Sequence, residues 1–257
     1  MELKSLGFIG GGRITRIMLR ALANKKAVLA SVKVCDTNPA VLNELQKQFP
    51  SIQTTDSCIS AAMQEIVFIA LHPPVIMETL EKIKESVTGK TQVVSLAPKI
   101  SINKVASMLA TRNIARMIPN ATSYINEGYN PVSFSDNYSS TEKQSLLGML
   151  NIMGITFEVE ESNLEAYAMV SAMLPTYFWF QWKELQNLGI QMGLDEQESK
   201  ETIQQTLLAS IDLFYNSGLT FTDVIDLIPV KPIGEHETQI SEIYQSKLMG
   251  LYQKIKP

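Results

Sequence analysis

Three consecutive glycines interrupt an apolar run near the start of the chain, in the stretch LGFIGGGRITRIML that begins at Leu6. The residues before the glycines predict a buried strand, and the apolar spacing after them predicts a helix. Gly10, Gly12 and Thr15 stand at the three glycine positions of a G-x-G-x-x-G pattern, with the third position changed. In that pattern the first glycine makes a tight turn, the second lets backbone approach a pyrophosphate, and the third allows close helix–strand packing. The stretch therefore predicts a phosphate-binding turn between a strand and a helix.

The first half of the chain alternates short β-branched runs with amphipathic segments, which is typical of βα units on a parallel sheet. The predicted strands are residues 3–9, 31–36, 52–54, 66–71, 92–95 and 114–117. The predicted helices are residues 13–24, 39–48, 74–85 and 102–109. Asn38, followed by Pro39, and Ser101 are side chains of the kind that cap a helix start. We therefore predict an α/β fold whose N-terminal domain is a Rossmann-type, doubly wound parallel sheet.

The pattern changes in the second half. NPVSF and ITFEVE predict two further strands around a helix that Ser139 and Glu142 open as a capping box. From Ser162 onward the chain is predicted helical, and Ser162 with Glu165 forms a second possible capping box. We place the domain boundary here, with a dinucleotide-binding domain over residues 1–159 and an all-helical domain over residues 160–257.

The helical half contains one unusually apolar segment, LEAYAMVSAMLPTYFWFQWKELQNLGI. Because it is apolar nearly all round, it should be buried, in part against a second subunit. Pro175 should kink or interrupt it. A further helix is predicted to end near Gly218, the prolines of IPVKPIGEHET predict a loop, and TQISEIYQSKLMGLYQKIK predicts a final amphipathic helix.

Composition excludes several classes of function. The net charge is −4 and no run of Lys or Arg is present, which argues against nucleic-acid binding. No stretch reaches the roughly 20 apolar residues of a membrane helix, and the N-terminus runs straight into the first strand without a signal peptide. The two cysteines make no disulfide framework, so we expect a cytoplasmic protein. Histidines and cysteines stand singly, without metal-ligand spacing, and no metal site is expected.

Asp36, at the end of the second predicted strand, is the expected partner of the cofactor's adenosine ribose. Its charge would repel a 2′-phosphate, and no basic residue follows in DTNPAV, which favours NADH over NADPH. Alternatively, Asp36 only caps the turn before the next helix. The full set of predicted cofactor-binding residues is Gly10, Gly11, Gly12, Arg13, Ile14, Asp36, Ala70, His72, Pro73 and Asn120.

Nearly the whole length of the chain resembles the pyrroline-5-carboxylate reductase family, whose members reduce a cyclic imine to proline with NAD(P)H. LGFIGGGRI is similar to the family's G-F-I-G-x-G-x-M, and IALHPP is similar to its A-V-K-P-Q, with His72 in the lysine position. VVSLAPKIS is similar to V-I-S-x-A-x-G-I-S, with Lys99 where the family usually has glycine. ARMIPNATSYINEG is close to R-x-M-P-N-T-P and is the most specific match. The resemblance implies a Rossmann domain followed by a helical domain that intertwines with a partner subunit, in a homodimer or larger homo-oligomer.

Two substrate motifs of that family are changed. Its S-G-S-G-P-A-Y corresponds to the run from Ser171 to Tyr177, where two glycines are replaced by Ala172 and Leu174. Its T-S-P-G-G-T-T loop aligns only loosely with IPVKPIGEHET, which removes paired glycines whose N–H groups could bind a carboxylate. The acceptor is therefore expected to be a small imine or a related carbonyl compound.

The candidate catalytic residues are His72, Asn120, Ser171 and Thr176. His72 could donate a proton or contact the ribose, or it could simply cap the HPP turn. Asn120 could position nicotinamide or substrate, or satisfy a turn. The hydroxyls of Ser171 and Thr176 could face a pocket, or bond a preceding carbonyl. Two other functions stay open: a dinucleotide-binding sensor without catalysis, and a deazaflavin-dependent NADP oxidoreductase.

Overall fold

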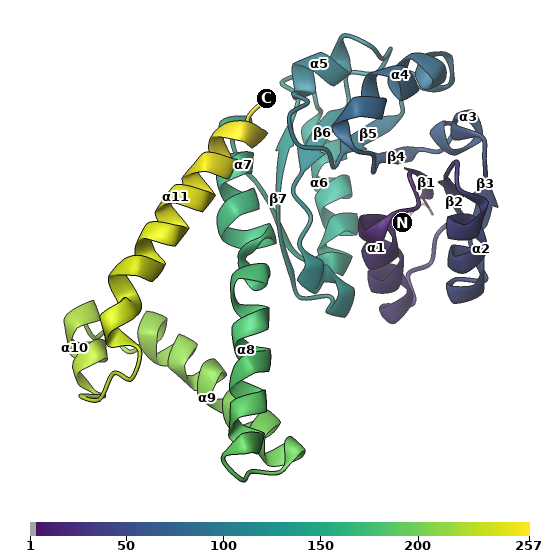
Figure 1. Cartoon of the computed structure of the whole chain (residues 1–257). Helices are drawn as coiled ribbons and strands as arrows, with labels where there is room; N and C mark the ends of the chain where they lie inside the picture. Colours follow the sequence, from purple (N-terminus) through teal and green to yellow (C-terminus); the bar gives the residue numbers. More distant parts are fainter. Residues whose placement is uncertain (1–3) are drawn as a thin grey trace. The chain divides into compact units, whose positions relative to one another are not determined.

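The computed structural model describes residues 4–257, so the predicted start of the first strand at Leu3 lies outside the described residues. Two compact units make up the chain. The first contains the residues up to Ala172 together with Tyr252–Pro257, and the second is Met173–Leu251. Figure 1 shows the sheet of the first unit and the long helices of the second. Along the described chain, no helix combines the length and apolarity needed to span a membrane.

The described residues of the first unit form one eight-stranded sheet in the order β3-β2-β1-β4-β5-β6-β7-β8. Strands β1 to β6 run parallel, β7 is antiparallel to β6, and β8 is parallel to β7. Their order across β3 to β6 is that of the doubly wound dinucleotide-binding fold, in which ligands bind where the order reverses, beside β1 and β4. The strand bounds are Ser5–Ile9, Ser31–Cys35, Gln53–Thr55, Ile66–Ile69, Gln92–Ser95, Ile114–Met117, Gly128–Phe134 and Gly154–Glu158.

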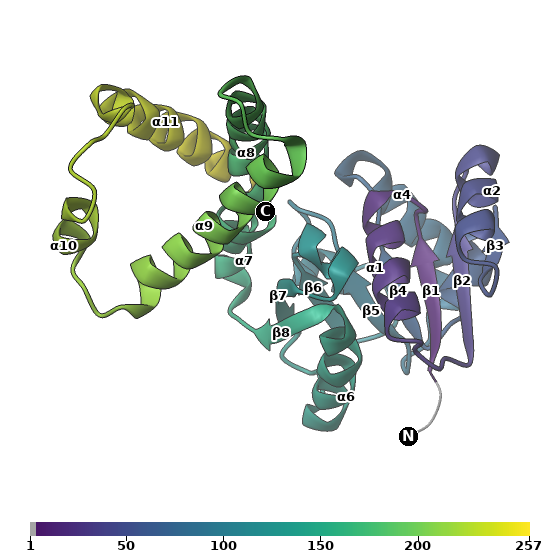
Figure 2. The same ribbon diagram turned by 90° about the horizontal axis from the view of Figure 1, so that it is seen from below.

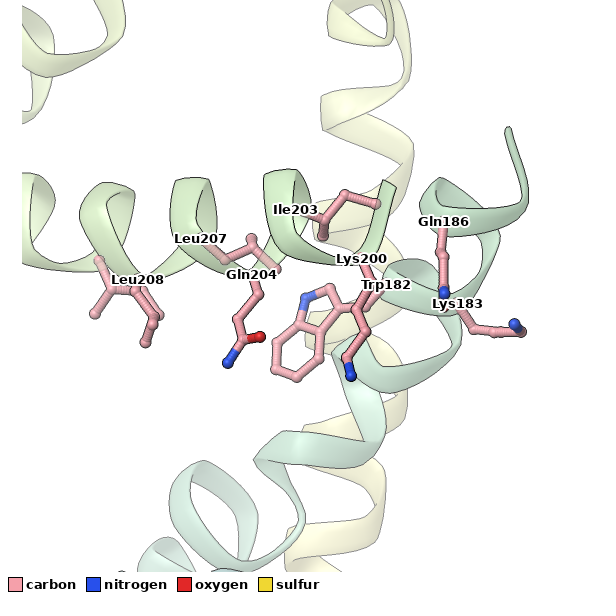
Figure 3. A pocket seen from close by; sticks show the side chains of 9 residues that line it. Trp182, Lys183, Gln186, Lys200, Ile203, Gln204, Leu207 and Leu208 are labelled. Atoms are coloured by element: carbon pink, nitrogen blue, oxygen red, sulfur yellow. The ribbon is translucent and has the colours of Figure 1, made fainter. Parts of the chain in front are cut away.

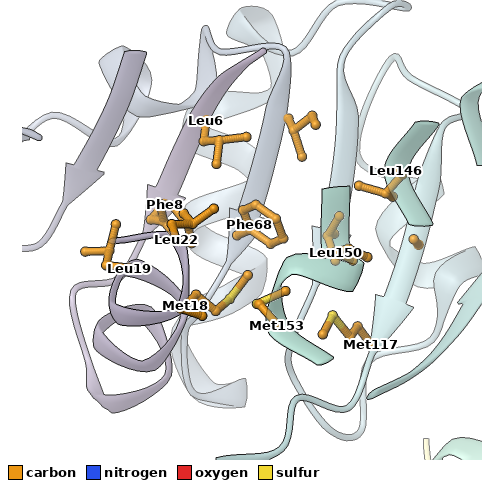
Figure 4. Packing of buried hydrophobic residues seen from close by; sticks show 14 of the residues in the cluster. Leu6, Phe8, Met18, Leu19, Leu22, Phe68, Met117, Leu146, Leu150 and Met153 are labelled. Carbon is orange, nitrogen blue, oxygen red and sulfur yellow. The ribbon is translucent and has the colours of Figure 1, made fainter. Parts of the chain in front are cut away.

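Helices cover both faces of this sheet (Figure 2). On one face lie α1 (Arg13–Asn24), α2 (Pro39–Gln48) and α6 (Ser140–Leu150). On the other lie α3 (Cys58–Ala62), α4 (Pro73–Ile83) and α5 (Ile102–Ala106). Side chains alternate between the faces along β1, as expected for a strand buried on both sides. Leu6 and Phe8 pack toward α1, with Phe8 stacked on Phe68 at 4.8 Å between ring centroids (Figure 4).

The predicted α/β, Rossmann-type fold class is confirmed, and several details of the elements are corrected. The helix α3 was not predicted, because five residues carry too little periodicity to be recognised. The helix predicted over residues 102–109 ends at Ala106. The helix predicted from residue 74 begins one residue earlier, because Pro73 has no N–H and fits the first helical position. Ser139 caps α6 by accepting the N–H of Glu142, as predicted.

The predicted capping box of Ser162 and Glu165 is wrong. Ser162 lies inside a 3₁₀ turn, and Glu165, in α7 (Leu164–Tyr167), is buried with its carboxylate 2.6 Å from Nη2 of Arg116. Nη1 of Arg116 also donates to Glu161 at 2.8 Å. The arginine comes from the middle of β6, so this ion-pair cluster ties residues 161–165 to the sheet.

The compact units of the structure divide after Ala172, whereas the functional domain boundary after residue 159 stays a prediction. Residues 160–172 pack with the first unit, because the carboxylates of Glu161 and Glu165 and the apolar side chains of Leu164 and Met169 are held there. A wide π-helical turn over Ala168–Ala172 ends this segment.

The second unit consists of α8 (Leu174–Gln191), α9 (Glu196–Asn216), α10 (Phe221–Asp226) and most of α11 (Glu237–Ile255). The predicted interruption at Pro175 is confirmed, because α8 begins anew at Leu174 with the proline in its first turn. The helix α9 ends just before Gly218, as expected, and that glycine has a φ of +77°. The short helix α10 was not predicted.

The expectation that the apolar helix is buried fails for α8 within this chain. None of the residues of α8 is buried, and Phe180 exposes 68% of its surface. An apolar groove of about 330 Å³ between α8 and α9 adds to the exposed apolar surface of the second unit (Figure 3). Its apolar lining residues are Trp182, Ile203, Leu207, Leu208 and Ile211.

Candidate functional site

The turn between β1 and α1 requires a glycine at its first position. Gly10 has a φ of +105°, and a Cβ there would lie 2.4 Å from the carbonyl oxygen of Ala70. Its N–H donates to the carbonyl of Cys35 at 2.8 Å, and its carbonyl accepts the hydroxyl of Thr15 at 2.6 Å. Thr15, at the third position of the pattern, is fully buried. Its hydrogen bond to Gly10 links the first turn of α1 to the glycine turn, a link that a glycine at this position could not make.

Gly12 has a different role, because a Cβ at this position would have no atom within 4 Å. It precedes the first turn of α1, where no side chain caps the helix. The N–H groups of a helix start without intrahelical partners attract anions, and the helix dipole adds to the attraction. The space in front of Gly12, beside these N–H groups, is open, as the predicted phosphate-binding turn requires.

Asp36 follows β2 and faces the glycine turn. Its Oδ2 accepts the N–H of Gly11 at 2.8 Å, and its Oδ1 accepts the N–H of Asn38 at 2.8 Å. The carboxylate is partly exposed and therefore has acceptor capacity left for a ribose hydroxyl. Gly11 is enclosed by α2, since a Cβ there would lie 2.8 Å from Cγ1 of Val41.

The remaining predicted cofactor residues follow the carboxyl ends of β1, β4 and β6, with Ala70 directly after β4. Arg13 and Ile14 are in the first turn of α1, with Arg13 exposed. His72 is the N-cap residue of α4 and Pro73 its first helical residue. The side chain of His72 is exposed and makes no capping hydrogen bond. The alternative in which His72 only caps the HPP turn through its side chain is therefore absent from the structure.

Asn120 and Ser171, two predicted catalytic residues 51 positions apart, are hydrogen-bonded to each other. Nδ2 of Asn120 donates to Oγ of Ser171 at 3.1 Å. Oδ1 of Asn120 accepts both the N–H and the hydroxyl of Thr122, at 3.0 and 2.9 Å, and so caps the short turn that follows. The amide is buried, whereas the serine is partly exposed. The pair therefore forms a fixed polar group that follows the carboxyl end of β6.

A third side chain, Asn130 of β7, holds this group in place. Its Oδ1 accepts the backbone N–H of Asn120 at 2.9 Å and the hydroxyl of Ser123 at 3.2 Å. The side chain of Asn130 is completely buried. Sequence analysis missed this residue, because an asparagine inside a predicted strand carries no signal of the turn to which it bonds.

Thr176 does not join the other candidates. It belongs to the second unit, and its hydroxyl donates to the carbonyl of Met173 at 2.7 Å. This bond is the local alternative considered above, in which a hydroxyl in a helix bonds a preceding carbonyl. Among the residues from 4 to 257, no cluster of three or more histidine, cysteine or acidic side chains could hold a metal ion.

Residues 5–99 match the sequence profile of a family described as "NADP oxidoreductase coenzyme F420-dependent". This match covers the glycine turn, Asp36 and His72 and ends before Asn120. Matches to individual proteins extend further. Pyrroline-5-carboxylate reductase of Staphylococcus saprophyticus is 21% identical over 251 residues, which are 96% of this chain and 92% of that protein. The protein of the same description from Pasteurella multocida is 26% identical over 215 residues, 82% of this chain and 78% of that one.

The fold has a solved counterpart. The crystal structure of Plasmodium falciparum pyrroline carboxylate reductase with NADP bound matches with a TM-score of 0.77 at 21% identity, covering 99% of this chain and 95% of that one. The similarity thus includes both the sheet and the helical region that follows it.

Proposed function

Because the chain belongs to the pyrroline-5-carboxylate reductase family, we propose that it is an NAD(P)H-dependent oxidoreductase that reduces a small cyclic imine. The observation that carries the proposal is the presence, in one unit, of an open, uncapped glycine turn at α1 and the hydrogen-bonded Asn120–Ser171 pair after β6. The glycine turn could hold a dinucleotide, and the Asn120–Ser171 pair could orient the acceptor. The solved relative whose structure contains bound NADP supports the first half of this assignment.

In the proposed site, the backbone N–H groups that follow Gly12 bind the pyrophosphate, with Arg13 adding positive charge. Asp36 accepts a hydroxyl of the adenosine ribose, while Ala70, His72 and Pro73 lie beside the cofactor after β4. When bound, the reduced nicotinamide supplies a hydride for the acceptor carbon. The chain itself supplies orientation and the exclusion of water, which account for much of the rate of such a reaction.

We assign the proton-handling and positioning groups to His72, Asn120 and Ser171. The hydroxyl of Ser171 accepts from Asn120 and donates to the carbonyl of Tyr129 at 3.3 Å, so its orientation is defined from both sides. The hydroxyl has one proton, so in the proposed reaction it turns that proton from the carbonyl of Tyr129 to an imine nitrogen or a substrate carboxylate while it still accepts from Asn120. The exposed imidazole of His72 is the proposed proton source, since imidazole is the commonest acid–base group in enzymes.

We further propose that the chain works in the cytoplasm as a homodimer or larger homo-oligomer. Several large apolar side chains along α8 are exposed, among them Trp179 and Phe180, and gathered exposed apolar side chains are typical of interaction surfaces. A second copy of the chain is the proposed cover for this surface.

The test of the proposed function is oxidation of NADH and NADPH by the purified protein with pyrroline-5-carboxylate as acceptor. We expect turnover with this substrate or with another small cyclic imine. The matched variant is Asn120→Asp, which keeps the acceptor for Thr122 but removes the donor to Ser171. We expect it to lower kcat roughly 100-fold, the usual cost of one positioned donor, with NADH binding retained. An unchanged kcat would remove Asn120 from the reaction.

The same assay separates the alternatives. Tight dinucleotide binding without turnover of any imine or carbonyl compound would contradict the oxidoreductase proposal and favour a sensor. Hydride exchange between NADP and a deazaflavin, without imine reduction, would favour the function named in the profile that matches residues 5–99.

Replacement of Asp36 should change the cofactor preference. We expect Asp36→Ala to weaken NADH binding roughly tenfold, by about 1.4 kcal/mol, because both the ribose acceptor and the bond to Gly11 are lost. Asp36→Asn keeps an acceptor for Gly11 but removes the negative charge, so NADPH should gain affinity relative to NADH. Titration of both cofactors with each variant measures this. If the ratio of the NADH to the NADPH dissociation constant is the same in the wild type, Asp36→Ala and Asp36→Asn, Asp36 does not select the cofactor.

A further inference from the structure

The two cysteines of the chain meet at the edge of the sheet that carries the glycine turn. Cys35 is the last residue of β2, and Cys58 is the first residue of α3, just after β3. Their Sγ atoms lie 2.7 Å apart, and both thiols are free. Cys35 is buried, whereas Cys58 is partly exposed. The parallel strands β2 and β3 pair directly, so this contact follows from the fold and not from nearness in the sequence.

The two thiols are chemically unequal. The pKa of Cys58 is lowered to about 7, chiefly by the hydrogen bond from Cys35 and also by the charge of Lys82, although burial and the charge of Asp36 act to raise it. The same hydrogen bond, followed by burial and the charges of Asp36 and Asp56, raises the pKa of Cys35. Cys58 is therefore the accessible nucleophile of the pair, and Cys35 is the resolving thiol.

We propose that Cys35 and Cys58 form a redox-sensitive dithiol, which low-molecular-weight disulfides oxidise to a disulfide and which thereby weakens dinucleotide binding at the glycine turn. The first part stands on the contact between the sulfurs alone. The second part rests on the proposed function. Intracellular disulfides, where they occur, are commonly transient and redox-sensing.

The oxidation is a thiol–disulfide exchange. The thiolate of Cys58 attacks one sulfur of the small disulfide, a mixed disulfide forms, and the first small thiol leaves with the proton of Cys58. The sulfur of Cys35 then loses its proton, attacks the sulfur of Cys58, and releases the second small thiol. The protein dithiol is oxidised by two electrons, and one small disulfide is reduced to two thiols.

Formation of the bond requires the sulfurs to approach from 2.7 Å to about 2.05 Å. The helix α3 packs closely against β1, since a Cβ on Gly7 of β1 would lie 2.0 Å from the carbonyl oxygen of Ala61 in α3. In the proposed coupling, Cys35 at the end of β2 therefore takes part in the approach together with Cys58.

The end of β2 is also what holds the glycine turn. The carbonyl of Cys35 accepts the N–H of Gly10 at 2.8 Å, and the adjacent Asp36 accepts the N–H of Gly11 at 2.8 Å. A shift of Cys35 is thus transmitted to both hydrogen bonds. The turn then loses the arrangement that leaves its remaining N–H groups directed at a phosphate.

The first measurement follows the thiols without any dinucleotide. The full-length protein is incubated with glutathione disulfide, and the intact mass and the number of alkylatable thiols are recorded. We expect the loss of two hydrogens and of both reactive thiols. The control Cys58→Ser should form neither the internal bond nor a lasting adduct at the buried Cys35. A wild-type protein that keeps both thiols, or that stops at a stable mixed disulfide, overturns the dithiol.

The second measurement compares NADH binding by the reduced protein, the oxidised protein and Cys58→Ser treated with the same disulfide. We expect oxidation to weaken binding roughly tenfold, within the range of typical couplings between sites, and a reducing agent to restore it. The treated Cys58→Ser protein should bind like the reduced wild type. Equal affinities of the oxidised and reduced wild type overturn the coupling.

Failure of the proposed function gives a different result. If the reduced wild-type protein binds neither NADH nor NADPH, the dinucleotide site and the coupling are both overturned, while the mass measurement still decides whether the dithiol exists.

Discussion

Replacement of Gly12 by valine is expected to abolish useful dinucleotide binding without unfolding the protein. A Cβ at Gly12 meets no protein atom within 4 Å, and its φ of −70° suits any residue, so the fold can accept a side chain. The isopropyl group would instead occupy the space in front of the N-terminus of α1. We expect the dissociation constant for NADH to rise roughly 100-fold or more, a loss of at least about 2.8 kcal/mol.

The measurement is a titration of both cofactors, with thermal unfolding recorded in parallel. Gly89→Val is the matched control, because Gly89 also has open space around its missing Cβ but precedes β5 at the opposite edge of the sheet. The control should keep the affinity of the wild type. Retained affinity in Gly12→Val would contradict a pyrophosphate site at this turn.

Removal of the guanidinium of Arg116 should cause the largest loss of stability. Arg116 is 1% exposed and pairs with Glu165, which is 2% exposed, and with the more accessible Glu161. Arg116→Met would leave the carboxylate of Glu165 buried without its partner. Breaking a buried ion pair in this way costs about 3–5 kcal/mol. Urea unfolding should show this loss as an earlier transition of the first unit.

Two further variants isolate the cause. In Arg116→Met combined with Glu165→Leu, both buried charges are absent, and we expect most of the stability to return, because apolar replacements of such pairs are often neutral. Lys84→Met removes one partner of an exposed pair with Glu81 and should leave the unfolding midpoint unchanged. A single Arg116→Met variant as stable as Lys84→Met would show that the pair does not hold residues 161–165 to the sheet.

Local patterns predicted the scaffold of the candidate site. The apolar run before Gly10, the helical spacing after Arg13 and the repeated βα alternation identify the sheet and the turn that opens it. These signals are short-range: strand and helix periods extend over a few residues, and a glycine turn is read from neighbouring positions. The short helices α3 and α10 were missed for the same reason, since each is too brief to show a period.

Side chains whose roles were predicted wrongly are those with partners far away in the sequence. Glu165 has the spacing of a capping residue, yet a buried guanidinium from β6 takes its carboxylate. The apolar character of α8 was read correctly from the sequence, and its expected cover, in part a second subunit, stays a prediction, because the helix is not buried within its own chain.

The sequence by itself determined the βα alternation, the glycine turn and the helical second half, because each depends on residues close together in the chain. Only the tertiary structure decided which distant side chains meet: Asn120 with Ser171, Arg116 with Glu165, and Cys35 with Cys58. Those meetings depend on the order of strands in the sheet and on how the following helices pack. Packing is a property of the whole fold, and no local pattern of residues encodes it.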